Sequence, residues 1–258
     1  FKLIVIVGPT ASGKSDMAIS LAQKCNSEIV SADSRQVYRG MNIGTSKVTK
    51  AQQRLVRHHL LDVADPRRDF SVVRYRRLAE KVIRDIAKRG RIPIIVGGTG
   101  FYIDSLVFGL SLPPVPPDKK LRAQLEKQSA EQLFAKLRKL DPRRAQNIDT
   151  KNKRRLIRAL EIVTTTDRPV PISYKLGVKS YDVLWLGITW PHEQLHERIR
   201  QRLNQRLRQG MVTEVKRLRT HNVSWQRLED FGLEYRWIAR YLRQKISYAE
   251  MKEGLARA

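Results

Sequence analysis

The sequence predicts an α/β fold in which a parallel sheet is interrupted by a helical insertion. Short runs of consecutive apolar residues alternate with amphipathic segments, the pattern of β-α-β units whose strands are buried on both faces. A proline-rich stretch, Leu112–Pro117, then separates them from a region with helical periodicity only. The buried-strand pattern returns at Val183–Thr189. We therefore expect residues 1–112 and 181–258 to form the core, and residues 113–180 the insertion.

Three strands are expected before the insertion, at Lys2–Val7, Glu28–Ser31 and Ile92–Val96. Their β-branched residues stand on consecutive positions, which favours central strands of a parallel sheet. The predicted helices between them are Asp16–Lys24 and Ser71–Arg89. The second has an apolar stripe at helical spacing and ends before Gly90. Arg35–Lys50 is predicted as a loop that contains a helical turn.

The insertion is predicted to be helical at Leu121–Gln128, Ala130–Leu140 and Lys151–Thr165, and irregular over Arg168–Lys179. The expected strand at Val183–Thr189 leads back into the core. Helical patterns follow to the end of the sequence, at Glu193–Gln209, Thr213–Thr220, Leu233–Arg243 and Ser247–Ala258.

The composition is strongly basic, with 51 Lys and Arg against 25 Asp and Glu and a net charge of +26. Such a charge predicts an anionic partner, such as nucleic acid, a polyphosphate or an anionic membrane surface. The single cysteine, Cys25, excludes a disulfide framework and a zinc-finger set. The longest apolar run, Leu3–Val7, is too short to span a bilayer, and no signal peptide is visible. We expect a cytoplasmic protein with no membrane association, trimmed at Phe1, where the chain begins inside a strand-like run.

The residues from Gly8 to Ser15 read GPTASGKS and match the phosphate-binding motif G-x-x-x-x-G-K-[ST]. They follow a predicted buried strand and precede a helix, as this loop requires. Its backbone N–H groups and the helix N-terminus attract phosphate. Lys14 is placed to reach the terminal phosphate, and Ser15 to coordinate Mg²⁺. A P-loop NTPase-like core that binds a di- or triphosphate is therefore predicted.

Two further segments follow directly after predicted strands, at the same edge of the predicted sheet. Asp33 follows the second strand, and its carboxylate could be a metal ligand, a general base or an N-cap for the next turn. The third strand ends in Gly97-Gly98-Thr99, where a nucleotide hydrolase of this class would carry a magnesium-binding Asp. The bound phosphate is therefore interpreted as a leaving group that is not itself hydrolysed.

Taken together, these motifs resemble the tRNA dimethylallyltransferases, also called tRNA isopentenyltransferases. The resemblance is carried by GPTASGKS from Gly8, DSRQVY from Asp33, GMNIGTSK from Gly40 and GGTGFY from Gly97, in that order. Weaker matches extend over nearly the whole chain: Asp141-Pro142, Arg154–Glu161, and Arg198–Val215 with its GMVTEV sequence. The family usually has Gly-Tyr-(Arg or Lys) where this chain has Glu234-Tyr235-Arg236, and it continues beyond the position of Ala258 into a basic segment. The sequence given stops at Ala258, before that segment.

The resemblance implies transfer of a dimethylallyl group from dimethylallyl diphosphate to N6 of the tRNA adenosine 3′ of the anticodon, with Mg²⁺. It implies that Asp33 is the general base, and that Thr99 and Arg202 bind the departing diphosphate oxygen. The diphosphate-binding residues would be Gly8, Thr10, Ala11, Ser12, Gly13, Lys14 and Ser15, and the metal ligand Ser15. The tRNA-binding residues would be Asp33, Ser34, Arg35, Gln36, Gly44, Thr45, Thr99, Arg122, Arg154, Arg155 and Arg158. The partners would be the tRNA anticodon stem-loop and the allylic diphosphate, and the enzyme a monomer.

The basic residues of the insertion support an RNA partner. Arg154, Arg155 and Arg158 lie opposite an apolar stripe of the same predicted helix. Arg198, Arg202 and Arg206 share one face of a later helix, where Arg202 would meet the diphosphate and its neighbours phosphodiesters. A solvated helix surface is the alternative interpretation of both groups.

Three other functions remain open. A free-nucleotide isopentenyltransferase would share the core but would not need a charge of +26. A P-loop kinase would need the magnesium-binding Asp that the third strand lacks. A basic RNA-binding module with a decayed site would be indifferent to replacement of Asp33.

Overall fold

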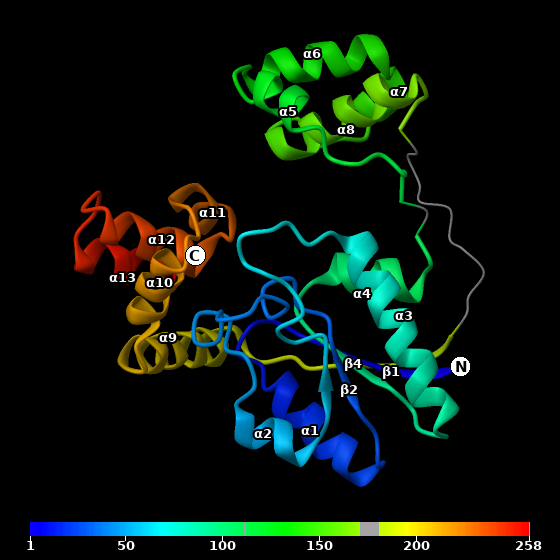
Figure 1. The fold of residues 1–258 in the computed structure, drawn as a ribbon, viewed down its shortest axis with the longest axis vertical. Helices are drawn as coiled ribbons and strands as arrows, with labels where there is room; N and C mark the ends of the chain where they lie inside the picture. Colours follow the sequence, from blue (N-terminus) through cyan, green and yellow to red (C-terminus); the bar gives the residue numbers. More distant parts are fainter. Residues whose placement is uncertain (111, 171–180, 258) are drawn as a thin grey trace. The chain divides into compact units, whose positions relative to one another are not determined.

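The structure is a computed structural model that describes residues 1–110, 112–170 and 181–257 (Figure 1). The chain forms two compact units. Residues 1–109 and 179–258 make up the core unit, and residues 110–178 the helical unit. The sequence placed these boundaries at 113 and 180.

A five-stranded parallel sheet forms the centre of the core unit. The strand order is β3-β2-β4-β1-β5, and Ile4 on β1 lies opposite Ile94 on β4 and Leu184 on β5. This arrangement confirms the predicted fold class. The strands are β1 (Lys2–Val7), β2 (Ile29–Ser31), β3 (His58–His59), β4 (Ile94–Val96) and β5 (Asp182–Gly187).

Helices cover both faces of this sheet, which is why its central strands are apolar on consecutive positions. Leu3 and Val5 point toward α3 (Val72–Lys88) and α4 (Gly100–Val107). The intervening Ile4 and Ile6 lie in the core beneath α1 (Lys14–Lys24). Figure 1 shows α1 and α2 (Lys50–Leu55) on one side of the sheet, and α3 with α4 on the other.

The predicted strand near residue 183 exists, but the prediction that it is buried was wrong. β5 is the edge strand and pairs with β1 only among the described residues. Leu184 is 57% exposed and Trp185 is 41% exposed. An apolar run cannot distinguish a central from an edge strand, because pairing is decided by the rest of the chain.

Several short elements were not predicted: α2, β3, α4, α7 (Pro142–Ala145) and α11 (Trp225–Asp230), of which α4, with eight residues, is the longest. Elements this short carry too little periodicity to be recognised. The longer helices α1 and α3 are confirmed. α1 begins at Lys14, two residues before the predicted start, and α3 is capped by the Ser71 hydroxyl, which accepts the Arg74 N–H.

A second hydrophobic core joins the loop after β2 to the C-terminal helices. Val37 and Met41, both fully buried, lie in one cluster with Met211, Val215 and Ile238. This cluster fixes the segment around residue 40 to the end of the chain. The helices are α9 (His192–Arg208), α10 (Met211–Thr220), α11 (Trp225–Asp230), α12 (Leu233–Leu242) and α13 (Tyr248–Arg257).

The helical unit has a hydrophobic core of its own, to which Leu133, Leu137, Leu156 and Leu160 contribute. Its helices are α5 (Lys119–Leu125), α6 (Ala130–Leu140), α7 and α8 (Lys153–Thr166). Most of the segment predicted as irregular, Arg168–Lys179, lies outside the described residues. None of the helices in the described parts of the chain combines the length and apolar character needed to cross a membrane.

Candidate active site

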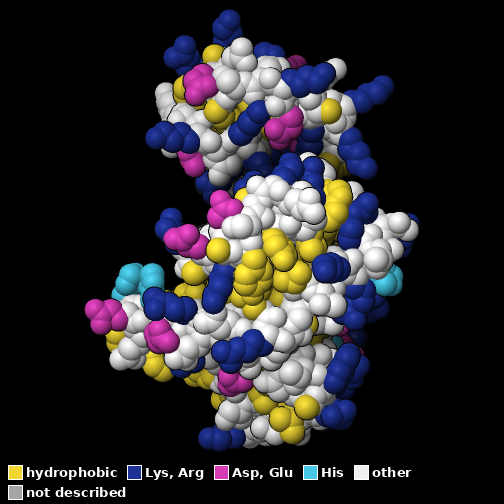
Figure 2. Space-filling model, turned by 90° about the vertical axis from the view of Figure 1, so that its left-hand side faces the viewer, with side chains coloured by type: hydrophobic (Ala, Val, Ile, Leu, Met, Phe, Trp, Pro, Cys, Tyr) yellow, Lys and Arg dark blue, Asp and Glu magenta, His cyan; other side chains and the backbone are white. Residues whose placement is uncertain are grey.

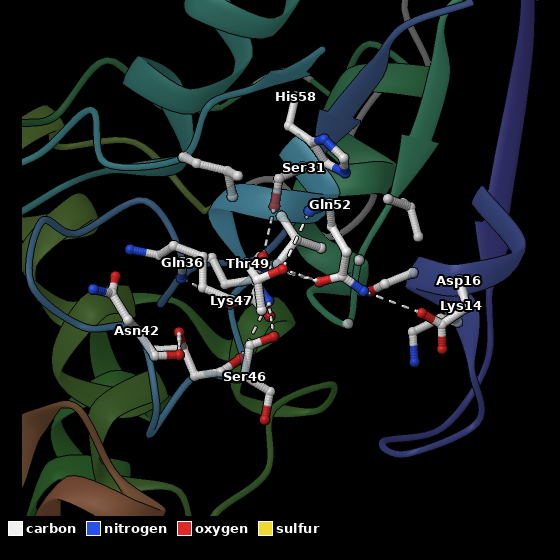
Figure 3. A pocket seen from close by; sticks show the side chains of 18 of the residues that line it. Lys14, Asp16, Ser31, Gln36, Asn42, Ser46, Lys47, Thr49, Gln52 and His58 are labelled. Atoms are coloured by element: carbon white, nitrogen blue, oxygen red, sulfur yellow. Dashed lines mark hydrogen bonds between the residues drawn. The ribbon is translucent and has the colours of Figure 1, made fainter. Parts of the chain in front are cut away.

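A cavity of about 600 Å³ opens where β1, β2 and β4 end. Ligands of open parallel sheets bind at these carboxyl ends of the strands. The phosphate loop, the turn after β2, the loop at residues 42–49 and one face of α9 line this cavity. In Figure 3, Lys14 and Asp16 lie on one side of it, and Gln36, Asn42 and Ser46 on the other.

The phosphate loop is sharply curled. Gly13 has a φ of +91° and Ala11, although not a glycine, a φ of +64°. At Gly8 a Cβ atom would lie 2.7 Å from the Ile188 carbonyl oxygen, so no side chain fits there. The left-handed conformation is costly for alanine, and the surrounding contacts must hold it.

Two side chains from the far end of the chain supply such contacts. Arg198 Nε donates to the Ala11 carbonyl oxygen (2.9 Å), and Trp190 Nε1 to that of Ser12 (2.9 Å). The Arg198 guanidinium also stacks on the Trp190 ring, 4.3 Å from its centroid. The sequence suggested that Arg198 meets RNA phosphodiesters. In the structure it stabilises the phosphate loop.

Lys14 lies across its own loop. Its Nζ donates to the carbonyl oxygens of Gly8 (2.8 Å) and Pro9 (2.5 Å). Burial and then the nearby charge of Arg202 lower the Lys14 pKa, while Asp33 opposes this shift. Lys14, Asp33 and Arg202 all line the cavity. The fold therefore brings together residues that lie up to 188 positions apart in the sequence.

Asp33 acts as a cap and also faces the cavity. Its Oδ1 accepts the N–H groups of Arg35 (2.7 Å) and Gln36 (3.2 Å), as the N-cap interpretation predicts. Its Oδ2 accepts no hydrogen bond from the described residues, and the side chain lines the cavity. One oxygen therefore organises the turn, and the other is available to a ligand.

Thr99 is held beside Asp33 and is not among the residues that line the cavity. The Ser34 N–H donates to Thr99 Oγ1 (2.9 Å), and the two hydroxyl oxygens are 3.3 Å apart. A Cβ atom on Gly97 would lie 2.2 Å from the Ala32 carbonyl oxygen. Glycine at this position therefore lets the segments after β2 and β4 touch.

Arg202 projects into the cavity from α9. Its Nε donates to Ser46 Oγ at 3.0 Å. Burial and the charge of Arg206 lower the Arg202 pKa, whereas Glu234 and Asp33 raise it. Arg206 itself is buried, and its NH1 donates to the Gly44 carbonyl oxygen (2.7 Å) and to Glu234 (2.8 Å). Arg206 is therefore not available to RNA phosphates.

The remaining predicted residues of the core unit have different environments. Gln36 lines the cavity, and its Nε2 donates to the Thr45 carbonyl oxygen (3.2 Å). Thr45 lines the cavity too, while Gly44 is buried behind it. The Arg35 guanidinium donates to the Asp230 carbonyl oxygen at 3.4 Å, and burial lowers its pKa.

The four predicted tRNA-binding arginines of the helical unit divide into two pairs. Arg122 and Arg158 both bind the carboxylate of Glu161, which is fully buried. Burial would raise the Glu161 pKa, but hydrogen bonds from these two arginines lower it to about 2. Arg154 and Arg155 are exposed on α8. Figure 2 shows Lys and Arg side chains spread widely over the face it draws, in keeping with the charge of +26.

The histidines were predicted to be packing or surface residues. His59 Nε2 lies 2.7 Å from the buried Glu28 carboxylate. His58 Nδ1 lies 2.8 Å from the Val56 carbonyl oxygen, and its ring borders the cavity. Burial lowers the His58 pKa, which favours the neutral form of the ring. Over the described ranges, no cluster of three His, Cys, Asp or Glu side chains could hold a metal.

The sequence assigned no role to Glu214 or Tyr235, which lie in the GMVTEV and Glu234-Tyr235-Arg236 segments. Glu214 is buried on α10 among Met211, Val215 and Leu218. A charged residue on an otherwise apolar helical stripe was the signal that could have revealed it.

The sheet and the curled loop at its edge define a P-loop NTPase-like α/β protein whose cavity suits a diphosphate. The family model described as IPP transferase matches residues 36–258. A tRNA dimethylallyltransferase of Roseiflexus sp. (strain RS-1) is 43% identical over 99% of this chain and 84% of its own. The chain therefore belongs to the tRNA dimethylallyltransferase family, as the resemblance of its motifs implied.

Solved structures of related enzymes support this family membership. The tRNA isopentenylpyrophosphate transferase of Bacillus halodurans has a TM-score of 0.72 and 36% identity, covering 99% of this chain and 82% of its own. A eukaryotic dimethylallyltransferase described as acting on tRNA has a TM-score of 0.75 and 27% identity, over 99% of this chain and 65% of its own.

Proposed function

We propose that this enzyme transfers a dimethylallyl group from dimethylallyl diphosphate to N6 of the adenosine immediately 3′ of the tRNA anticodon, releasing diphosphate. One observation carries the proposal: a single cavity is lined by a phosphate loop, a half-buried arginine and a carboxylate with one unoccupied oxygen. The family membership supplies the substrates.

The departure of diphosphate is assisted by positive charge. As the bond between the allylic carbon and the diphosphate oxygen breaks, negative charge gathers on that oxygen. Lys14, Arg202 and the loop N–H groups at the start of α1 stabilise it. Ser15 lines the cavity, and its hydroxyl oxygen is a hard ligand of the kind that Mg²⁺ prefers. A bound Mg²⁺ would add charge neutralisation at the diphosphate.

Asp33 serves the nucleophile. An exocyclic adenine amine is a weak nucleophile and must lose a proton as its bond to the allylic carbon forms. The Asp33 carboxylate accepts this proton, which contributes about 10²–10⁴-fold to the rate. Thr99 accepts a hydrogen bond from the N–H of Ser34, the residue after Asp33. Thr99 therefore fixes the position of Asp33 through the turn that follows β2.

The RNA partner is bound by positive charge outside the cavity. The anticodon loop is single-stranded, so its bases can be unstacked and read on their edges. We assign Arg154 and Arg155 on α8 to phosphate contacts, and expect the target base to be turned out of the loop into the cavity. The enzyme is proposed to act as a monomer in the cytoplasm.

Transfer of labelled dimethylallyl groups from the diphosphate to an anticodon stem-loop tests this function. Digestion of the RNA should yield an N6-prenylated adenosine beside the anticodon. Transfer to AMP in place of RNA would instead identify a free-nucleotide isopentenyltransferase, and phosphate transfer from ATP a kinase.

The variant Asp33→Asn sharpens the assay, because the amide oxygen can still cap Arg35 and Gln36. We expect turnover to fall by about 10²–10⁴-fold while stem-loop affinity is retained. Unchanged turnover would refute the role of Asp33 as the base.

A further inference from the structure

Three consecutive backbone N–H groups in the loop after β2 converge on one carboxylate. Asn42 and Ile43 donate to Glu214 Oε2 at 2.8 and 2.7 Å, and Gly44 donates to Oε1 at 3.0 Å. Glu214 is only 1% exposed. Such a row of N–H groups is a typical anion-binding site, but here an anion of the protein itself occupies it.

Tyr235 on α12 completes this arrangement. Its hydroxyl donates to Glu214 Oε1 at 2.9 Å. Burial, and next the charge of Glu214, raise the Tyr235 pKa well above its usual value, so the hydroxyl remains a donor. A Cβ atom on Gly44 would lie 2.7 Å from the Tyr235 hydroxyl oxygen, so the loop backbone packs directly on the phenol ring.

The same loop contacts two arginines of α9. The Gly44 carbonyl oxygen accepts from the buried Arg206 (2.7 Å), and Ser46 Oγ accepts from Arg202 Nε (3.0 Å). Ser46 is the one side chain, among the described residues, that bonds the Arg202 guanidinium. The position of the loop therefore sets the direction in which Arg202 points.

We propose that Glu214 and Tyr235 are positioning residues, which act through the loop at residues 42–46 to aim the Arg202 guanidinium at the departing diphosphate. With Nε engaged by Ser46, the two terminal nitrogens of Arg202 remain for the diphosphate oxygens. This inference rests on the proposed function, and it gives a role to two conspicuous sequence features, the GMVTEV segment and the Glu-Tyr-Arg segment.

Inorganic diphosphate binding, measured by calorimetry, tests the proposal without requiring turnover. Tyr235→Phe removes only the hydroxyl group and its hydrogen bond, and we expect it to weaken diphosphate binding about threefold to tenfold. Tyr75→Phe is the matched control, because the buried Tyr75 hydroxyl on α3 has no hydrogen-bond partner in the described part of the chain. It should leave diphosphate affinity unchanged.

A double-mutant cycle separates positioning from general structural support. If Tyr235 acts through Arg202, Tyr235→Phe should cause no further loss in an Arg202→Ala background. Equal losses in both backgrounds, or no loss in either, would overturn the proposal. Ser46→Ala interrupts the same path outside the core. It should reproduce the loss of affinity with an unchanged melting temperature.

Steady-state kinetics then distinguish this proposal from the function on which it rests. Tyr235→Phe should lower kcat and leave KM for the stem-loop unchanged, whereas a loosened fold would change both. If the native enzyme transferred no prenyl group but the diphosphate cycle showed the expected coupling, the proposed function would fail and the positioning role would stand.

Discussion

The two glycine-containing loops at the cavity differ in what their polar groups bind. The phosphate loop, residues 8–15, keeps its N–H groups at the start of α1 for a ligand, and its cation Lys14 rests on its carbonyl oxygens. In the loop at residues 42–46, the N–H groups of Asn42, Ile43 and Gly44 are occupied by Glu214. Gly13 gives the first loop a left-handed residue, whereas Gly44 gives the second loop room beside the Tyr235 ring. A buried internal anion turns the second loop into structural support.

The helical unit repeats this contrast among its arginines. Arg122 and Arg158 are held by the internal carboxylate of Glu161, whereas Arg155 is exposed on α8. A basic residue or an N–H row thus predicts an anion, and only the folded structure shows whether that anion belongs to the protein or to a substrate.

The largest loss of activity should follow from removal of Lys14, the cation of the phosphate loop. We expect Lys14→Ala to lower kcat/KM by about 10²–10³-fold, since it removes a charge that stabilises the leaving diphosphate. Steady-state transfer assays measure it. Lys24→Ala, at the exposed end of the same helix, is the control. Similar losses in both variants would mean that bulk charge matters and the loop does not.

A substitution in the loop at residues 42–46 should change the free energy of unfolding. Gly44→Ala forces a methyl group against the Tyr235 ring, so we expect about 1–3 kcal/mol of destabilisation, with weaker diphosphate binding. Denaturant unfolding measures the free energy. Gly187→Ala, where a Cβ atom meets nothing within 4 Å, should change it little. A Gly44→Ala protein as stable as the native one would contradict the close packing described here.

Acid should break the ion pairs at Glu161. Hydrogen bonds from arginines, acting against burial, lower the pKa of Glu161 to about 2 from the usual 4.5. Because the folded pKa is the lower one, this contribution is complete above pH 4.5 and is lost as pH falls toward 2. Circular dichroism at successive pH values should show Arg122→Ala losing helix at a higher pH than the native protein. Coincident acid transitions would argue against the contribution of this pair.

The smallest effect is expected at the exposed arginines. Arg155→Ala should weaken stem-loop binding a few-fold and reduce the slope of log affinity against log salt by about one. Arg122→Ala should lower the melting temperature and leave that slope nearly unchanged, because Glu161 already neutralises its charge. If Arg122→Ala reduced the salt slope and Arg155→Ala did not, the RNA contact would belong to Arg122 and Arg158, contrary to our assignment.

The parallel sheet and the cavity edge were predictable because their signals are local. Buried strands with consecutive apolar residues, such as Lys2–Val7, lead into motifs whose glycines and charges stand at fixed offsets. Asp33 could be placed at the edge of the sheet from its strand alone. Its dual use, with one oxygen capping the turn, required the folded structure.

The contacts between distant segments were not predictable. Glu214 meets Gly44 across 170 positions, and Arg202 meets Ser46 across 156. No periodicity in the sequence links such pairs. The sequence assigned Arg198 and Arg206 to RNA because a charged helix face has the same residue pattern whether it contacts solvent or another loop.

The bonds that Trp190 and Arg198 make to Ser12 and Ala11 have a consequence for biosynthesis. These partners lie 178 and 187 positions apart. At about 5–20 residues per second, a ribosome needs roughly ten to forty seconds to extend the nascent chain over that span. The first catalytic segment to be translated is thus among the last to reach its working shape, and polypeptides released early hold an incomplete pocket.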